Sequence, residues 1–206
     1  MLVLALLVAA SGSPRGVPLA HGSNDLVAAL GPFRPQTGSW VEYLVRSRGE
    51  QDVRIRFAVV APPSDRARAW VEMAIVGSRS IPFATRLLLN AATGKLERAS
   101  VYALGQAPIE VPVGDGEQMI GSPFRSVITG RGKAVTVPAG TFTTTELRVS
   151  NGDRVSRVWR SDEVPLWGIV RSRQRARTME LLRFGRSGAR SVFSALHGNG
   201  NESANE

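Results

Sequence analysis

The side chains that perform chemistry in enzymes are scarce in this chain of 206 residues. It has two histidines, His21 and His197, and no cysteine. Neither histidine lies on a segment that we predict to be a strand, so a Ser-His-Asp triad or a histidine metal site inside the fold lacks its residues. Without cysteine there is no thiol catalysis and no lipid-modified N-terminal cysteine. We therefore predict no catalytic residues, no metal site and no cofactor.

Paired carboxylates are the one catalytic option that the sequence leaves. Asp162 and Glu163 lie between two tryptophans, and a glycosidase needs two carboxylates that face one sugar ring. Adjacent residues on an extended chain point to opposite faces, so this pair needs a further acid, such as Glu42 or Glu72. A carboxylate-dependent hydrolase is therefore a minor alternative, and a solvated turn before Pro165 is the simpler interpretation.

Arginine dominates the charge, which is formally +9, and a surface of this sign attracts anions. After Gly168 the arginines alternate with other residues, which predicts four guanidinium groups on one face of a strand: Arg171, Arg173, Arg175 and Arg177. They are candidates for contact with an anionic surface such as lipid head groups. Aromatic residues do not interleave with them, which disfavours nucleic acid. The other interpretation is an outward strand face in a chain whose arginine content reflects a GC-rich coding sequence.

Aromatic residues on the predicted strands form a second candidate site. On the concave side of a curved sheet they would line a pocket for an apolar or lipid-like ligand, or they would fill the interior as core. The candidate lining residues are Trp40, Tyr43, Phe57, Trp70, Tyr102, Phe142, Trp159 and Trp167.

The elements that must position these side chains are short and mostly alternate between apolar and polar residues, which is typical of strands. We predict strands at residues 40–46, 53–57, 69–76, 87–89, 96–104, 134–137, 142–149, 154–160, 166–175 and 178–184. Residues 90–95 form a hairpin turn, a Gly- and Pro-rich loop extends to about residue 132, and a short helix is placed at residues 190–196. The fold class is all-β and mainly antiparallel: a single curled sheet or incomplete barrel of about ten strands with little helix.

The chain divides into four parts. Residues 2–10 are an apolar run that is shorter than the ~20 residues of a membrane span, so we interpret residues 1–20 as a signal peptide and leader. Residues 21–31 form a linker, residues 32–196 a β-rich domain and residues 197–206 a disordered tail. These assignments predict a bacterial protein that is periplasmic or extracellular after signal cleavage, with no transmembrane span.

Two motifs suggest kinship. Residues 137–142 read Val-Pro-Ala-Gly-Thr-Phe, a corner between strands in which Pro presets φ and Gly permits a positive φ. Residues 159–165 follow the pattern Trp-x-Ser-x-x-Val-Pro, and a Gly-x-Val strand begins at Gly168. With these motifs the chain resembles a family of uncharacterised exported β-rich bacterial proteins. More distantly its strand pattern is similar to the lipoprotein-localisation factors, half-barrel lipid carriers that wrap a curved sheet around a helical plug.

Together these observations favour a non-enzymatic cell-envelope binding protein that holds an apolar or lipid-like ligand on a curved sheet. The alternative is a structural or assembly protein that docks an envelope protein by its basic face or a sheet edge.

Overall fold

The computed structural model describes residues 33–60, 67–76, 83–92, 94–103, 108–111, 125–151 and 154–192. Predictions that concern the signal peptide, the linker, both histidines and the tail lie outside these residues. The strands of the described part are β1 (Trp40–Ser47), β2 (Val53–Val60), β3 (Arg68–Val76), β4 (Phe83–Asn90), β5 (Leu96–Ala103), β6 (Ile109–Val111), β7 (Arg125–Val137), β8 (Gly140–Asn151), β9 (Arg154–Arg160), β10 (Ile169–Gln174) and β11 (Arg177–Gly185).

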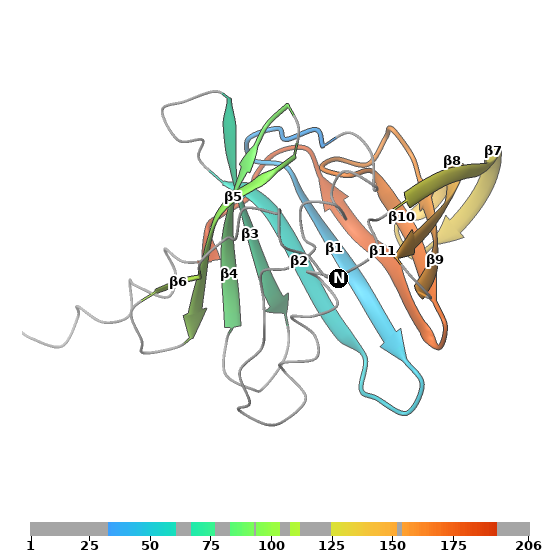
Figure 1. The fold of residues 1–206 in the computed structure, drawn as a ribbon, viewed down its shortest axis with the longest axis horizontal. Helices are drawn as coiled ribbons and strands as arrows, with labels where there is room; N and C mark the ends of the chain where they lie inside the picture. The colour runs from blue at the N-terminus through green and yellow to red at the C-terminus, as the bar shows by residue number, and fades with distance from the viewer. Residues whose placement is uncertain are drawn as a thin grey trace, which may run out of the picture.

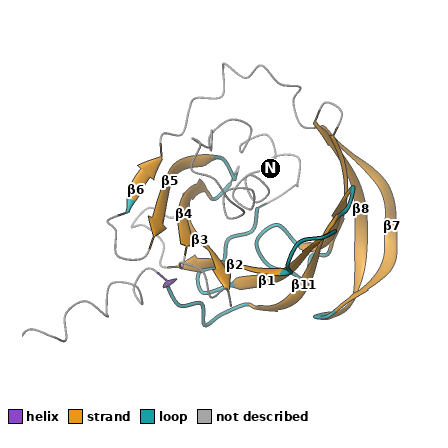
Figure 2. Cartoon of the chain, turned by 90° about the horizontal axis from the view of Figure 1, so that it is seen from below, coloured by secondary structure: helices purple, strands orange, loops and turns teal. Residues whose placement is uncertain are grey.

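All eleven strands belong to one antiparallel sheet with the order β6-β5-β4-β3-β2-β1-β11-β10-β9-β8-β7. Two meanders, β1 to β6 and β7 to β11, meet where β1 pairs with β11 at the middle of the sheet (Figure 1). The sheet curls strongly but does not close, so β6 and β7 remain its two separate edges (Figure 2). The predicted fold class, an all-β curled sheet, is confirmed.

The main core lies on one face of this sheet, which we call the core face. Alternate residues of β1 and β2 point to it, including Val41, Tyr43, Ile55 and Phe57, all at most 3% exposed. The Tyr43 hydroxyl donates a hydrogen bond to the carbonyl of Ile169 at 3.1 Å, and its burial raises the pKa of the phenol. This alternation is the period of two that predicted the strands.

A loop at residues 161–168, which contains most of the second motif and which we call the plug loop, packs on the core face. Its side chains Val164, Leu166 and Trp167 are buried, and Trp167 stacks on Phe33 with ring centroids 5.3 Å apart. Gly168 has φ +71°, and a Cβ there would lie 2.7 Å from the Ser161 carbonyl oxygen. The motif glycine is therefore required by the turn of this loop.

The first motif is the tip of the β7–β8 hairpin, as its Pro-Ala-Gly corner predicted. Pro138 and Ala139 form the turn, and Gly140 has φ +132°. The Ala139 amide donates to the Leu181 carbonyl of β11 at 3.2 Å. The hairpin thus reaches back to the middle of the sheet.

Two regions were placed wrongly from the sequence. The segment predicted as a loop up to residue 132 contains β6 and the first part of β7, which runs from Arg125 to Val137. Register shifts around Gly130 interrupt the pairing of β7 with β8, and such bulges break the period of two. In the other case, the strand predicted at residues 166–175 begins only at Ile169, because Leu166 has φ +61° and belongs to the plug loop.

Candidate anion-binding groove

The face opposite the core face carries most of the paired charges, and we call it the arginine face. Side chains that lie directly across neighbouring strands share a face, so the strand register defines rows of residues that cross the sheet. One row runs from β2 through β1 to β11 and contains Arg56, Glu42 and Arg183. We call it the glutamate row because its central residue is an acid.

The glutamate row is compensated. Glu42 is 1% exposed, and Arg183 forms a salt bridge to its Oε2 at 2.9 Å, while Arg54 lies 4.0 Å from its Oε1. Trp40 lies beside these charges, with the Arg56 guanidinium 4.9 Å from its ring centroid. Burial of the carboxylate is tolerated here because Arg183 pairs with one of its oxygens and Arg54 lies near the other.

A second row begins at Arg46, four residues after Glu42 on β1, and crosses the meander β7 to β11. Arg46 of β1 lies opposite Thr178 of β11, which faces Arg173 of β10, Arg157 of β9 and Arg148 of β8 in turn. We call Arg148, Arg157 and Arg173 the arginine ladder. All three are exposed, and none of them forms an ion pair within the described part of the chain. Like charges directly opposite each other destabilise a sheet.

An open groove of about 730 Å³ lies over two residues of the ladder, Arg157 and Arg173. We call it the arginine groove, and it is lined by Val155, Arg157, Trp159, Arg171, Arg173, Arg175, Thr178 and Glu180. Four cations and one acid thus line the same groove as a tryptophan that is partly buried against the core cluster. Such a combination binds an anionic group beside an apolar one.

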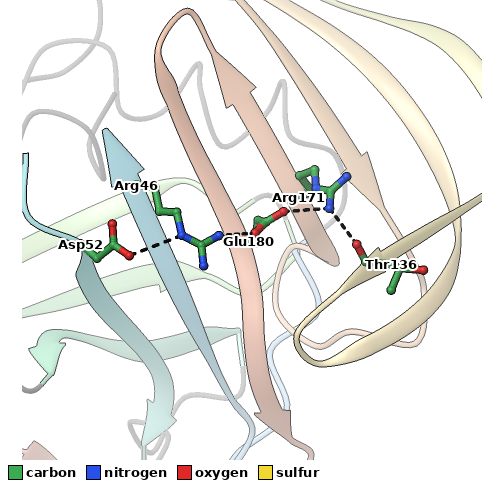
Figure 3. A network of polar contacts seen from close by, with 5 residues as sticks. All are labelled: Arg46, Asp52, Thr136, Arg171 and Glu180. Atoms are coloured by element: carbon green, nitrogen blue, oxygen red, sulfur yellow. Dashed lines mark hydrogen bonds and ion pairs between the residues drawn. The ribbon is translucent and has the colours of Figure 1, made fainter. Parts of the chain in front are cut away.

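Glu180, the acid of the groove, is already engaged. Arg46 and Arg171 each form a salt bridge to it at 2.8 Å, and Arg171 also donates to the carbonyl of Thr136 at 2.7 Å. Figure 3 shows this network crossing from β1 to the β7–β8 hairpin, with Asp52 bound to the other side of Arg46. Arg171 is therefore engaged within the wall of the groove, whereas Arg157, Arg173 and Arg175 form no ion pair within the described part of the chain.

Glu146 of β8 lies near the ladder but is bound elsewhere. Lys133 forms a salt bridge to it at 2.5 Å. The hydrogen bond from Lys133 is the largest cause that lowers the pKa of Glu146, and the charge of Arg157 adds to it. The ladder thus influences this acid without pairing with it.

The predicted arginine stripe is only partly formed. Arg171 and Arg173 share a face of β10, but the strand ends at Gln174, and Arg175 lies in a two-residue turn with φ +48°. Arg177 begins β11 and donates to the Ser47 hydroxyl at 2.9 Å. The prediction of four arginines on one strand was wrong, because no Gly or Asn marked the turn.

The eight aromatic candidates do not share one surface. Tyr43, Phe57, Phe142 and Trp167 belong to the main core cluster. On the arginine face, Trp40 and Trp70 lie under arginines, Tyr102 packs in a small cluster with Ala74, Ala84 and Val192, and Trp159 lines the groove. A ligand-lining role therefore remains a proposal for Trp159.

The carboxylates that sequence reasoning considered are bound by separate partners. Asp162 is in the exposed turn and pairs with Arg34 at 2.9 Å. Glu72 accepts bonds from Arg86 at 2.7 Å and from the Val192 amide at 2.8 Å. Among the described residues, no group of three or more His, Cys, Asp or Glu side chains could hold a metal ion.

Sequence reasoning missed Arg148 and Arg157 as site residues. Both lie on predicted strands, but their places opposite Arg173 depend on the registers of β8, β9 and β10. A search for exposed arginines on consecutive antiparallel strands is the signal that could have found them.

The fold defines the class of protein: a curled, unclosed antiparallel sheet with a plug loop on one face and arginines on the other. No protein-family model and no curated protein matches the sequence. No helix in the described ranges has the length and apolar character that a membrane crossing requires.

Several solved structures are similar to it. The MucA/MucB complex of Pseudomonas aeruginosa matches at 11% identity with a TM-score of 0.45, over 84% of this chain and 58% of that chain. A provisionally assigned exported protein with a YmcC-like fold from Bacteroides fragilis matches at 13% identity and a TM-score of 0.35, over 74% of this chain and 98% of that one. A provisionally assigned lipoprotein from Parabacteroides distasonis has 11% identity and a TM-score of 0.34, over 74% and 97%.

The chain spans 55% of the MucB chain in a second complex, with MucA(peri), which is less than two thirds of that protein. The neighbours include one exported protein and one lipoprotein. Their TM-scores are below 0.5, so they carry no argument about the function of this chain.

Proposed function

We propose that this protein is a non-enzymatic binding protein of the cell envelope that holds an anionic, lipid-like ligand in the arginine groove. The observation that carries the proposal is the set Arg157, Arg173 and Arg175, three exposed cations without an acidic partner among the described residues, beside Trp159. The cations would contact the head group, and Trp159 with Val155 would contact apolar atoms.

Two features that destabilise the fold support a role of these arginines in binding rather than in folding. Arg157 faces Arg173 directly across β9 and β10, and a like-charge pair of this kind destabilises a sheet by about 0.2–1 kcal/mol. Arg175 occupies a left-handed conformation with φ +48°, where a residue other than Gly, Asn or Asp costs about 1 kcal/mol. Residues that destabilise the fold through strain cluster at functional sites.

Vesicle binding tests the proposal. The purified protein should co-sediment with vesicles that contain phosphatidylglycerol and not with vesicles of phosphatidylcholine alone, and the fraction bound should fall at high salt. Arg173→Glu with Arg175→Glu should abolish the binding. Arg98→Glu is the matched control, because Arg98 is an exposed arginine on β5, far from β9 in the strand order.

Equal binding by the double variant and the control would contradict the proposal. Native mass spectrometry of protein purified from its own envelope gives an independent result. A co-purifying ligand that the double variant lacks is expected, and a ligand-free protein in every preparation would count against the groove as a carrier site.

A second candidate function is docking of a protein partner at the β7 edge. Val127 and Ile128 of this edge strand are 62% and 47% exposed, and an open strand edge pairs readily with another chain. Val127→Asp would then reduce co-purification of a partner and leave vesicle binding unchanged. Loss of the partner in the Arg173→Glu, Arg175→Glu variant instead would move the docking site to the groove.

A further inference from the structure

The arginine ladder reaches beyond the groove. Arg157 and Arg173 line the groove, but Arg148, the third residue of the ladder, lies one strand further on β8, directly opposite Arg157. Directly opposed side chains have Cβ atoms about 5 Å apart. Arg157 is therefore the central residue, with one guanidinium on each side and a third cation, Arg175, at the turn that follows β10.

The charge at this position is unusually concentrated. Within the described part of the chain, four cations (Arg148, Arg157, Arg173 and Arg175) have no ion pair, and the two acids in the neighbouring row, Glu146 and Glu180, are bound by Lys133 and by Arg46 with Arg171. A single carboxylate would neutralise one of the four. A phosphate monoester carries about −1.5 to −2 charge at pH 7 and offers three acceptor oxygens, and guanidinium forks bind such oxygens in pairs.

We infer that the arginine ladder is a site for a doubly charged phosphate-type group, clamped between Arg157 and its neighbours Arg148 and Arg173. This inference rests on the proposed function and specifies the head group that the groove accepts. Trp159 lies in the next row, opposite Arg171, and is placed to contact whatever part of the ligand adjoins the phosphate. A phosphate monoester occurs as a lipid head group and on soluble molecules, so the test must separate these two sources.

The test compares two vesicle compositions of equal surface charge. Phosphatidic acid presents a phosphate monoester, and phosphatidylglycerol presents a singly charged diester. The wild-type protein should bind phosphatidic acid vesicles about tenfold more tightly, because one additional charge-assisted hydrogen bond contributes about 1.5 kcal/mol. Arg157→Met should reduce this preference to less than about twofold while keeping the side-chain volume and the fold. Arg98→Met, on β5, should keep the full preference.

Titration calorimetry with inorganic phosphate separates the sources. Phosphate binding that depends on Arg157, without binding to either vesicle type, would support the phosphate site, assign it to a soluble ligand and contradict the lipid part of the proposed function. Equal binding of the two vesicle types would overturn the inference and leave the proposed function standing. A preference that survives Arg157→Met would overturn it as well. Absence of binding to phosphate and to both vesicle types would overturn both proposals.

Discussion

The glutamate row and the arginine ladder occupy the same face of one sheet, in rows four residues apart along β1. They differ in the charge of the central residue. In the glutamate row a buried acid lies between two arginines, Arg56 and Arg183. In the ladder an arginine, Arg157, lies between two others. Because the first row shows that this sheet can place an acid at the centre of such a row, the ladder is not a requirement of the fold.

The same compensation recurs over the first meander. Arg86 pairs with Glu72 at 2.7 Å, Arg68 with Glu97 at 2.6 Å, and Arg46 with Asp52 and Glu180. Among the described residues, arginines without an ion pair also occur on other strands, as at Arg56 of β2 and Arg98 of β5. The ladder differs from them because three such arginines lie directly opposite one another on β8, β9 and β10, which favours a ligand that supplies the missing negative charge.

The largest expected difference between the two rows comes from removing one arginine from each. Arg183→Met leaves the buried Glu42 carboxylate with Arg54 at 4.0 Å as its remaining ion-pair partner, so the free energy of unfolding should fall by about 3 kcal/mol. Arg173→Met removes a like-charge contact and should leave stability unchanged or slightly higher. Urea denaturation of both variants measures this, and equal losses would remove the distinction between the rows.

Gly168→Ala should separate the core face from the arginine face. The φ of +71° and the 2.7 Å approach to the Ser161 carbonyl make a Cβ unfavourable at this position, so the plug loop must shift, at a cost of about 2 kcal/mol. Phosphatidylglycerol vesicle binding by the folded variant should stay at the wild-type level. A parallel loss of binding would show that the plug loop and the groove act together.

Arg175→Asn tests whether Arg175 destabilises the turn after β10 while it contributes to binding. Asn adopts a positive φ more easily than Arg, so the variant should gain about 0.5–1 kcal/mol of stability and bind anionic vesicles less tightly. Thermal denaturation and vesicle co-sedimentation give the two readings. A less stable variant would mean that the Arg175 side chain stabilises the turn, so that its positive φ does not lower the stability of the fold.

The smallest effect is expected at Lys133, where a compensated pair borders the ladder. Lys133 is half exposed, so Lys133→Met should reduce stability by less than about 1 kcal/mol at neutral pH. The lowered pKa of Glu146 means that the pair stabilises the fold above the ordinary carboxyl pKa of 4.5 and loses this effect as the pH falls through the lower folded value. The difference between variant and wild type should therefore vanish in acid, and a difference that persists there would point to lost packing.

The sequence predicted this fold through local signals. Alternation marked β1, β2 and β3, and the Pro-Ala-Gly corner marked the tip of the β7–β8 hairpin. The prediction failed where the deciding contacts are distant in sequence. Arg148 and Arg173 share a row only because β8, β9 and β10 pair in one register, and the turn at Arg175 lacks the residues that favour positive φ.

Replacing the centre of the ladder by an acid, Arg157→Glu, tests the central claim most directly. The variant recreates the arrangement of the glutamate row with Arg148 and Arg173 on its two sides. If the ladder binds an anionic ligand and does not stabilise the fold, the free energy of unfolding of the variant in urea should be about 0.5–1 kcal/mol higher than that of the wild type. Binding of the variant to phosphatidic acid vesicles should be lost. A variant that is less stable than the wild type, or that still binds these vesicles, would contradict the account.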